Sequence, residues 1–235
     1  MKLFLVIPTI DGKLTADTFS SLWRIRVEPS IAAQLHTMAW NQDVVRVRNR
    51  AVYEFLKSDA DVLWFVDADV GFPPEVPKRM VEAIAAGKHL VAAAYPKKRV
   101  DWPALGDVAR GADLSPFEWA FQLHEAATEH GPWKQAELVP MGMTMISREL
   151  AAKVAEGAPR YGDRYGDGKI HQVPDVFGLM LIQQESGVAL LPEDYSFTLR
   201  ARHFGYQPWV LLDPICTHTG IMCFDVRKIM GEVVG

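Results

Sequence analysis

Two aspartates, Asp67 and Asp69, directly follow the uninterrupted apolar run of residues 62–66. Side chains two positions apart in an extended segment point the same way, so both carboxylates should leave the end of a buried strand together. Ligands of open α/β sheets bind at that edge, and carboxylate oxygens suit a hard divalent cation that can in turn bind diphosphate. A turn or a solvated strand end would account for the same spacing, so the Asp-X-Asp pattern alone leaves both interpretations open.

A second acidic pair, Glu193 and Asp194, stands between Pro192 and a helix-like stretch that extends to about Phe204. Capping and the helix dipole would explain acids at the start of a helix. The chemical alternative is that one carboxylate, for which we favour Asp194, is a general base that faces an acceptor hydroxyl.

His218 follows the last strand-like run, between Thr217 and Thr219. A single histidine is usually an ordinary polar residue. As a third ligand beside Asp67 and Asp69, its imidazole would favour Mn²⁺ over Ca²⁺ or Mg²⁺. The expected cofactor is therefore a divalent cation, Mn²⁺ in preference to Mg²⁺.

Basic residues gather at two points that could meet phosphate. Arg48, Asn49 and Arg50 lie near the start of a predicted helix, where guanidinium groups can form paired hydrogen bonds to anionic oxygens or simply cover a solvated face. Lys97 and Lys98 follow another apolar run. We expect Lys97 to meet the leaving phosphate and Lys98 to meet an acidic acceptor.

Residues 100–138 are rich in Trp, Pro, Gly and charge, which predicts an insertion or a lid beside the sheet. Trp102 and Trp133 lie in this segment. Their rings could stack on an acceptor sugar or base, or they could fill a core beneath the insertion.

The elements that must position these residues alternate between strand-like and helix-like stretches. This order predicts one α/β domain over residues 1–235, with a Rossmann-like, mostly parallel sheet and helices on both faces. The residues around 161–169 are rich in Gly and Asp and predict a loop. The predicted strands cover residues 3–10, 31–40, 62–66, 90–94, 141–146 and 208–212, and the longer predicted helices cover residues 46–58, 73–87, 148–155 and 193–204.

Composition narrows the class of protein. The 235 residues carry a formal net charge of −4, which is not the polycationic signature of a nucleic-acid or anionic-membrane binder. No apolar run reaches the length of a signal-peptide core or a membrane span, so a cytoplasmic location is expected. Cys216 and Cys223 lack a metal-binding spacing and are expected to be free thiols.

Taken in order along the chain, these motifs resemble the GT-A fold of nucleotide-sugar glycosyltransferases, and the resemblance spans nearly everything outside residues 100–138. It is nearest to small, stand-alone, family-two-like transferases, including those of bacteriophages. The chain lacks the Gln-X-X-Arg-Trp motif of polysaccharide polymerases and the Gly-rich loop of sugar-nucleotide pyrophosphorylases. The segments that carry the resemblance are residues 3–9, Arg48-Asn49-Arg50, Asp67-Ala68-Asp69, residues 141–146, Pro192-Glu193-Asp194 and His218.

The resemblance implies a role for each matching position. The implied donor residues are Pro8, Thr9 and Asp11 near base and ribose, Asp67, Ala68 and Asp69 near ribose and metal, and Gly142 under the sugar; His218 would bind the metal, and Glu193 and Asp194 would lie near the acceptor.

The expected function is metal-dependent transfer of a sugar from a nucleoside-diphosphate sugar, with a UDP-sugar as the first choice, to an acceptor hydroxyl. A hydroxymethylated base in phage duplex DNA is one acceptor, which an extruded-base mechanism would accommodate. A saccharide, lipid-linked or protein acceptor is the broader alternative. A non-catalytic nucleotide-sugar-binding module is a third interpretation.

Overall fold

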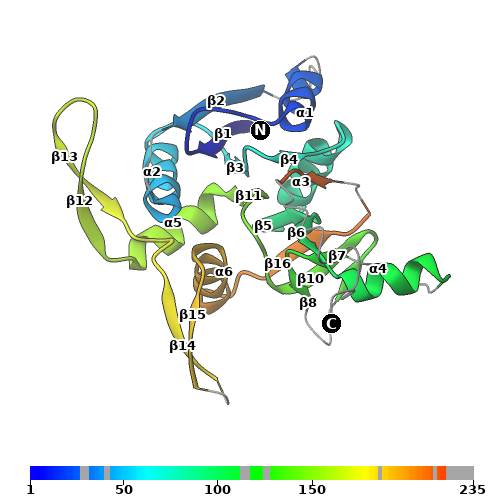
Figure 1. Cartoon of the computed structure of the whole chain (residues 1–235). Coiled ribbons are helices and arrows are strands. Elements are labelled where there is room, and N and C mark those ends of the chain that lie inside the picture. The colour runs from blue at the N-terminus through cyan, green and yellow to red at the C-terminus, as the bar shows by residue number, and fades with distance from the viewer. Residues whose placement is uncertain are drawn as a thin grey trace, which may run out of the picture.

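The computed structural model describes residues 1–26, 32–39, 43–111, 117–123, 128–184, 187–213 and 216–220. A nine-stranded sheet runs through the centre of the protein (Figure 1). Its strands lie in the order β2 (Ala32–Ala39), β1 (Lys2–Thr9), β3 (Val62–Val66), β11 (Met143–Ser147), β5 (Leu90–Ala93), β16 (Pro208–Leu211), β10 (Trp133–Leu138) and β8 (Gln122–Leu123), and β9 (Glu129–His130) also pairs with β10.

Most strands of this sheet run in one direction. β1 is parallel to β2 and β3, and β5 is parallel to β16. β11 is antiparallel to both of its neighbours, and β10 is antiparallel to β16, β8 and β9. The predicted α/β class and its mostly parallel sheet are confirmed, with β11 and β10 as the reversed strands. Because parallel strands share a carboxyl edge, the residues that follow β1 and β3 meet there.

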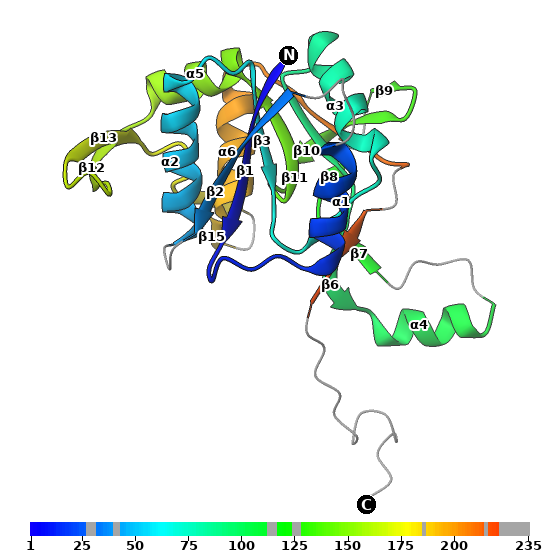
Figure 2. The ribbon, with the colours of Figure 1, turned by 90° about the horizontal axis from the view of Figure 1, so that it is seen from above.

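Helices cover both faces of the sheet (Figure 2). Side chains alternate along β1, so that Phe4 and Val6 belong to one core and Leu3 and Leu5 to the other. The first core includes residues of α2 (Val44–Lys57), α5 (Arg148–Gly157) and α6 (Glu193–His203), and the second includes residues of α1 (Ala16–Arg26) and α3 (Glu75–Ala85).

Side-chain caps fix the start of two of these helices. The Asp43 carboxylate accepts a hydrogen bond from the Val45 amide at the start of α2, and the Ser147 hydroxyl accepts one from Leu150 at the start of α5. The cap of α2 matters for the site, because this helix carries Arg48 in its second turn.

The predicted insertion is shorter than expected. After β5 the chain forms β6 (Pro96–Val100), α4 (Trp102–Ala109) and β7 (Phe117–Trp119), and α4 projects from the body of the protein (Figure 2). Residues 133–138, however, form β10 of the central sheet. Trp133 is only 9% exposed and belongs to the core, because its strand pairs with β16.

A hairpin replaces the predicted loop at residues 161–169. β12 (Arg160–Arg164) pairs with β13 (Ile170–Pro174), and only the turn between them retains the expected loop character. Asp163 of β12 is fully buried and forms ion pairs with Arg46 and Arg50 of α2. These contacts, which are distant in sequence, tie the hairpin to the helix.

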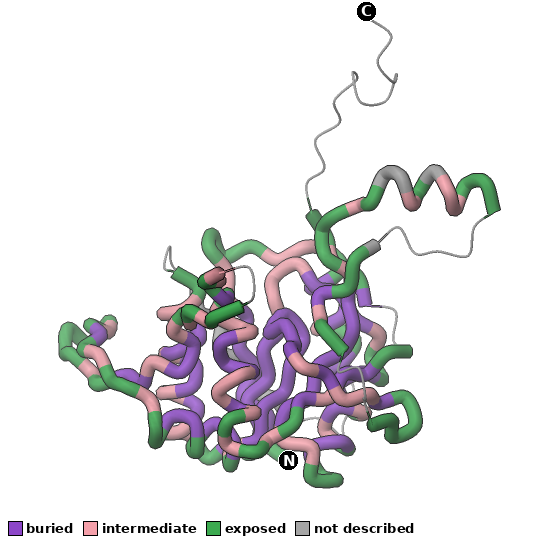
Figure 3. The backbone as a smooth tube through the Cα atoms, turned by 90° about the horizontal axis from the view of Figure 1, so that it is seen from below, coloured by how far each residue is buried: buried purple, intermediate pink, exposed green. Residues whose placement is uncertain are grey.

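Two further strand pairs flank the start of α6 and the carboxyl edge of the sheet. β14 (Met180–Gln184) forms a two-stranded sheet with β15 (Gly187–Leu191), which leads directly into α6. β17 (Thr217–His218) pairs with β4 (Val70–Gly71) just after the Asp-X-Asp segment. The central strands are buried, whereas the hairpins and the described residues of α4 are exposed or partly exposed (Figure 3). Within the described ranges, no helix is both long and apolar enough to cross a membrane.

Candidate functional site

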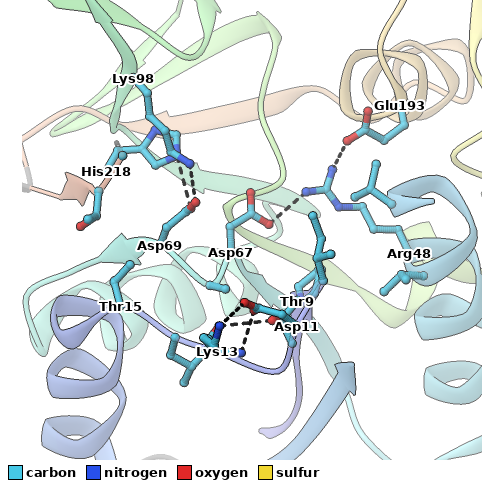
Figure 4. Close-up of a pocket in the computed structure, with 18 residues that line it drawn as sticks. Thr9, Asp11, Lys13, Thr15, Arg48, Asp67, Asp69, Lys98, Glu193 and His218 are labelled. Atoms are coloured by element: carbon cyan, nitrogen blue, oxygen red, sulfur yellow. Dashed lines mark hydrogen bonds and ion pairs between the residues drawn. The ribbon is translucent and has the colours of Figure 1, made fainter. Parts of the chain in front are cut away.

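A pocket of about 1050 Å³ opens at the carboxyl edge of β1 and β3 (Figure 4). It collects side chains from the β1–α1 loop, from α2, from the segment after β3, from β6, from the start of α6 and from the segment around β17. Its lining residues are Pro8, Thr9, Ile10, Asp11, Lys13, Leu14, Thr15, Val44, Val47, Arg48, Asp67, Ala68, Asp69, Lys98, Glu193, His218, Thr219 and Gly220.

Arg48 joins the two acidic pairs that the sequence singled out. One guanidinium nitrogen donates to Asp67 Oδ1 at 3.1 Å, and another donates to Glu193 Oε1 at 2.5 Å. The Arg48 side chain is only 4% exposed. Burial by itself would lower the pKa of Arg48, but Asp67 and Glu193 outweigh it and the pKa is raised. Arg48 therefore remains a fixed positive charge that orients both carboxylates.

Asp69 meets two nitrogen-bearing side chains. His218 Nε2 lies 3.4 Å from Asp69 Oδ1, and the Lys98 ammonium forms an ion pair with Asp69 Oδ2. The antiparallel pairing of β17 with β4 and a Thr219 amide bond to the Asp69 carbonyl at 2.8 Å bring His218 to this position. Burial would raise the pKa of Asp69, but His218 and Lys98 outweigh it and the pKa is lowered. Asp69 is therefore ionised at neutral pH.

The chemistry of His218 is suited to a metal ion. Its Nδ1 lies 2.8 Å from the Pro96 carbonyl oxygen, which can only accept, so Nδ1 carries the hydrogen. When the ring is neutral, the Nε2 lone pair faces Asp69 Oδ1, and these two atoms can hold a cation; when the ring is protonated, Nε2 donates to Asp69 instead. A backbone carbonyl that fixes the tautomer in this way is a common partner of metal-binding histidines.

The residues fit a cation with two protein ligands, Asp69 and His218. Asp67, the third expected ligand, points one carboxylate oxygen at Arg48 instead. No cluster of three His, Cys, Asp or Glu side chains suited to a metal occurs within the described part of the chain. Diphosphate oxygens and water would complete the coordination of such a cation, as is usual where a metal serves a phosphate ligand.

Gly142 supports Asp67 from beneath and does not line the pocket. The Asp67 amide donates to the Gly142 carbonyl at 2.8 Å, and the Gly142 amide donates to Tyr95 Oη at 3.0 Å. A Cβ at position 142 would collide with the Tyr95 hydroxyl and lie 2.8 Å from Asp67 Oδ2. Only glycine therefore allows these three groups to approach so closely.

The two acids at the start of α6 differ in their surroundings. Glu193 lines the pocket and is paired with Arg48, whereas Asp194 accepts a hydrogen bond from the Tyr195 amide at 2.8 Å. Burial, followed by the negative charge of Glu193, raises the pKa of Asp194 to about 6. Asp194 is thus a base that is ionised at neutral pH and can still accept a proton.

Several residues expected at the site lie elsewhere. Asn49 bonds to Asp175 and to the Phe177 amide, and Arg50 is held by Asp163 and Tyr165. Both therefore fasten α2 to neighbouring segments rather than facing the pocket.

The remaining departures concern the expected phosphate and acceptor residues. Lys97 pairs with Glu118 at 3.2 Å outside the pocket, and of these two adjacent lysines it is Lys98 that lines the pocket. Trp133 is in the core, and the side chain of Trp102 lies outside the described part of the structure.

The structure places two further residues, Lys13 and Tyr95, at or next to the pocket. Lys13 lines the pocket and forms an ion pair with Asp11 at 3.0 Å. In the sequence, the only indication of a role for Lys13 was its place in the short segment that follows the first strand, which ends near Pro8. Tyr95 could have been found more readily, because it follows the strand at 90–93 on the same sheet edge as Asp67.

Comparison with solved structures finds the same architecture. The crystal structure of A197 from STIV aligns with a TM-score of 0.56 and 17% identity over 94% of this chain and 87% of that chain. The structure of GalNAc-T7 with UDP, GalNAc and Mn²⁺ aligns with a TM-score of 0.51 and 8% identity over 94% of this chain and 43% of that chain. No protein-family model and no curated protein matches the sequence. The two TM-scores show a shared fold despite the low identities, and the protein has the GT-A fold that its motifs predicted.

Proposed function

We propose that this protein is a divalent-cation-dependent glycosyltransferase that moves a sugar from a nucleoside-diphosphate sugar to an acceptor hydroxyl. The observation that carries the proposal is the meeting of Asp67, Asp69 and His218 in one pocket with the Arg48–Glu193 pair. These residues are distant in sequence, and the GT-A fold brings them to the edge where α/β sheets bind nucleotides. A UDP-sugar is the donor we propose, and GalNAc-T7, which shares the fold, was crystallised with UDP and Mn²⁺.

The donor would lie along the carboxyl edge of β1 and β3. In this arrangement Pro8, Thr9 and Asp11 are the residues next to the nucleoside, and Asp67 is held by Arg48 for a ribose hydroxyl. Asp69 and His218 would hold Mn²⁺, or Mg²⁺ in its place, and the cation would neutralise charge on the leaving diphosphate.

Asp194 is the proposed general base. It would remove the proton of the acceptor hydroxyl while the acceptor oxygen bonds to the anomeric carbon and the bond to the diphosphate oxygen breaks, with the electron pair leaving on the nucleoside diphosphate. Because its pKa is about 6, the base is ionised above that pH. We therefore expect kcat/KM to fall about tenfold per pH unit below pH 6. A direct displacement inverts the anomeric centre, which proton NMR of the first-formed product would show.

Charge near the site bears on the acceptor. Lys97 is paired with Glu118 and Lys98 with Asp69, so these lysines offer little free positive charge to a DNA backbone. This favours a hydroxyl on a saccharide, lipid-linked or protein acceptor over a hydroxymethylated base in duplex DNA. The salt dependence of binding separates the two classes, because DNA binding that releases counterions weakens steeply as salt rises.

The direct test is nucleotide release from a panel of nucleoside-diphosphate sugars with Mn²⁺, with Mg²⁺ or with EDTA. We expect slow, cation-dependent hydrolysis of one donor, and its loss in Asp69→Asn. Asp59→Asn is the matched control, because Asp59 forms an exposed ion pair with Lys2 away from the pocket. Full activity of Asp69→Asn would contradict the proposal, and nucleotide binding with no release from any donor and acceptor would identify a non-catalytic binding module instead.

A further inference from the structure

Lys98 lies beside the position that the proposed cation would take. The two oxygens of Asp69 are divided between two partners, with His218 Nε2 on Oδ1 and the Lys98 ammonium on Oδ2. Lys98 comes from β6, whose first residue, Pro96, holds the other nitrogen of His218. One short strand therefore orients the histidine and also supplies a positive charge beside the carboxylate.

The glycine at position 220 shapes this contact. A Cβ at Gly220 would lie 2.9 Å from Cδ and 3.2 Å from Cγ of Lys98, so the lysine stem runs directly against the Gly220 backbone. That packing aims the ammonium at Asp69. The Lys98 side chain nevertheless stays 39% exposed and lines the pocket, so its end is free to move within it.

A divalent cation on Oδ1 and an ammonium on Oδ2 of Asp69 would lie a few ångströms apart, and like charges at that distance repel each other. A cation that enters between Asp69 and His218 therefore weakens the attraction of Asp69 for the Lys98 ammonium. Among described residues that line the pocket, the other acids already have positive partners: Asp67 and Glu193 share Arg48, and Asp11 has Lys13. The group left to receive the displaced ammonium is the anionic diphosphate of the donor.

We propose that Lys98 is a displaceable internal counter-ion: it neutralises Asp69 in the ligand-free protein and transfers to the donor diphosphate when the divalent cation binds. The proposal rests on the proposed function and assigns this residue a role within it. In this arrangement, binding of the cation and binding of the nucleotide depend on each other. A cation that binds alone leaves the Lys98 ammonium without an anionic partner, whereas a nucleotide that binds with it supplies the diphosphate as that partner. By linkage, each ligand then tightens the other by the same factor.

The test measures Mn²⁺ binding directly, without turnover, from the electron paramagnetic resonance signal of free Mn²⁺ in the presence and absence of UDP. Lys98→Met should tighten Mn²⁺ binding about three- to tenfold without UDP, since the competing charge is gone. The factor by which UDP tightens Mn²⁺ binding should shrink correspondingly. Lys98→Arg should resemble the wild type, and Lys97→Met is the matched control that should leave Mn²⁺ affinity unchanged.

A second variant keeps the positive charge of Lys98 but shifts its position. Gly220→Ala should push the Lys98 stem aside and tighten Mn²⁺ binding in the same direction as Lys98→Met, which covers the case in which Lys98→Met fails to fold. Thermal unfolding of each variant checks that it is folded.

The outcomes separate this proposal from the proposed function. Unchanged or weaker Mn²⁺ binding in Lys98→Met and Gly220→Ala, with binding still lost in Asp69→Asn, would overturn the counter-ion and leave the metal site standing. Absence of Mn²⁺ binding in the wild type and in all variants, with and without UDP, would overturn both.

Discussion

The two acidic pairs have the same kind of side chain and opposite surroundings. Asp67, Asp69 and Glu193 line the pocket, and Asp194 adjoins Glu193 without being a lining residue. After β3, Asp67 is held by Arg48, and Asp69 is held by Lys98 and His218. At the start of α6, Glu193 shares Arg48, whereas burial and the neighbouring charge raise the pKa of Asp194 to about 6. The pairs thus separate into three carboxylates that are held by positively charged or imidazole side chains and one, Asp194, that can take up a proton near pH 6.

The largest expected effect comes from removing the charge of Asp194, the carboxylate with the raised pKa. Asp194→Asn should lower kcat about 10²- to 10⁴-fold, since a general base contributes about that much, with little change in KM for the donor. The measurement is the initial rate of sugar transfer once donor and acceptor are known. A variant that kept more than half of the wild-type kcat would remove the distinction between Asp194 and its neighbours.

The next largest effect is expected from Arg48, whose positive charge is shared by Asp67 and Glu193. Arg48→Met should destabilise the protein by about 3 kcal/mol, because it strands Asp67 and Glu193 beside each other without a buried partner. Urea unfolding measures this. Lys57→Met, which removes only the exposed ion pair with Glu54, should cost less than about 1 kcal/mol. Equal costs for the two variants would show that Arg48 is an ordinary surface charge.

The ionised carboxylate of Asp194, which the proposed reaction needs as a base, should lower the stability of the folded protein. Because the pKa of Asp194 is raised, the folded state binds the proton more tightly than the unfolded chain does. The stability that the protonated carboxyl contributes is therefore full below about pH 4 and is lost as the pH rises through about 6. Asp194→Asn, which cannot ionise, should therefore be more stable than wild type by about 2 kcal/mol at pH 8 and about equal at pH 4. Unfolding at both pH values checks the sign, and a variant that is less stable at pH 8 would contradict the raised pKa.

The smallest expected effect tests how Asp67 is supported. Gly142→Ala should cost about 1–2 kcal/mol, because its methyl group meets the Tyr95 hydroxyl and the Asp67 carboxylate. Tyr95→Phe removes one of the two obstacles. The double variant should therefore lose less stability than the sum of the single variants, and simple additivity would show that the groups do not touch.

The local sequence predicts the central strands and helices well because each has a clear apolar period. Val62–Val66 is buried on both faces and matches β3 residue for residue. The hairpin at β12–β13 was missed because its stability depends on Asp163 reaching Arg46 and Arg50, and such distant pairing leaves no periodic signal. Trp133 was placed in the insertion for the same reason, since only its pairing with β16 reveals a sheet strand.

The site shows a similar division. Asp67, Asp69, Glu193 and His218 line the pocket, and they could be singled out beforehand because carboxyl edges and helix starts are readable from sequence. Asp194 is not among the lining residues, and the roles expected of all five residues stay predictions. Lys97 and Lys98 were exchanged, since adjacent residues of a strand point to opposite sides and the sequence does not say which side faces the pocket. Arg50 and Asn49 were drawn in by their nearness to Arg48, although helix geometry turns successive residues away from one another.

The pairing of β17 with β4 has a consequence for biosynthesis. The strands that hold Asp67 and Asp69 leave the ribosome early, whereas His218 emerges only after the rest of the described sheet has been made. A nascent chain therefore carries its paired acids long before their imidazole partner arrives, and nonsense products that stop short of residue 218 would retain the central strands and yet lack half of the proposed metal-binding pair.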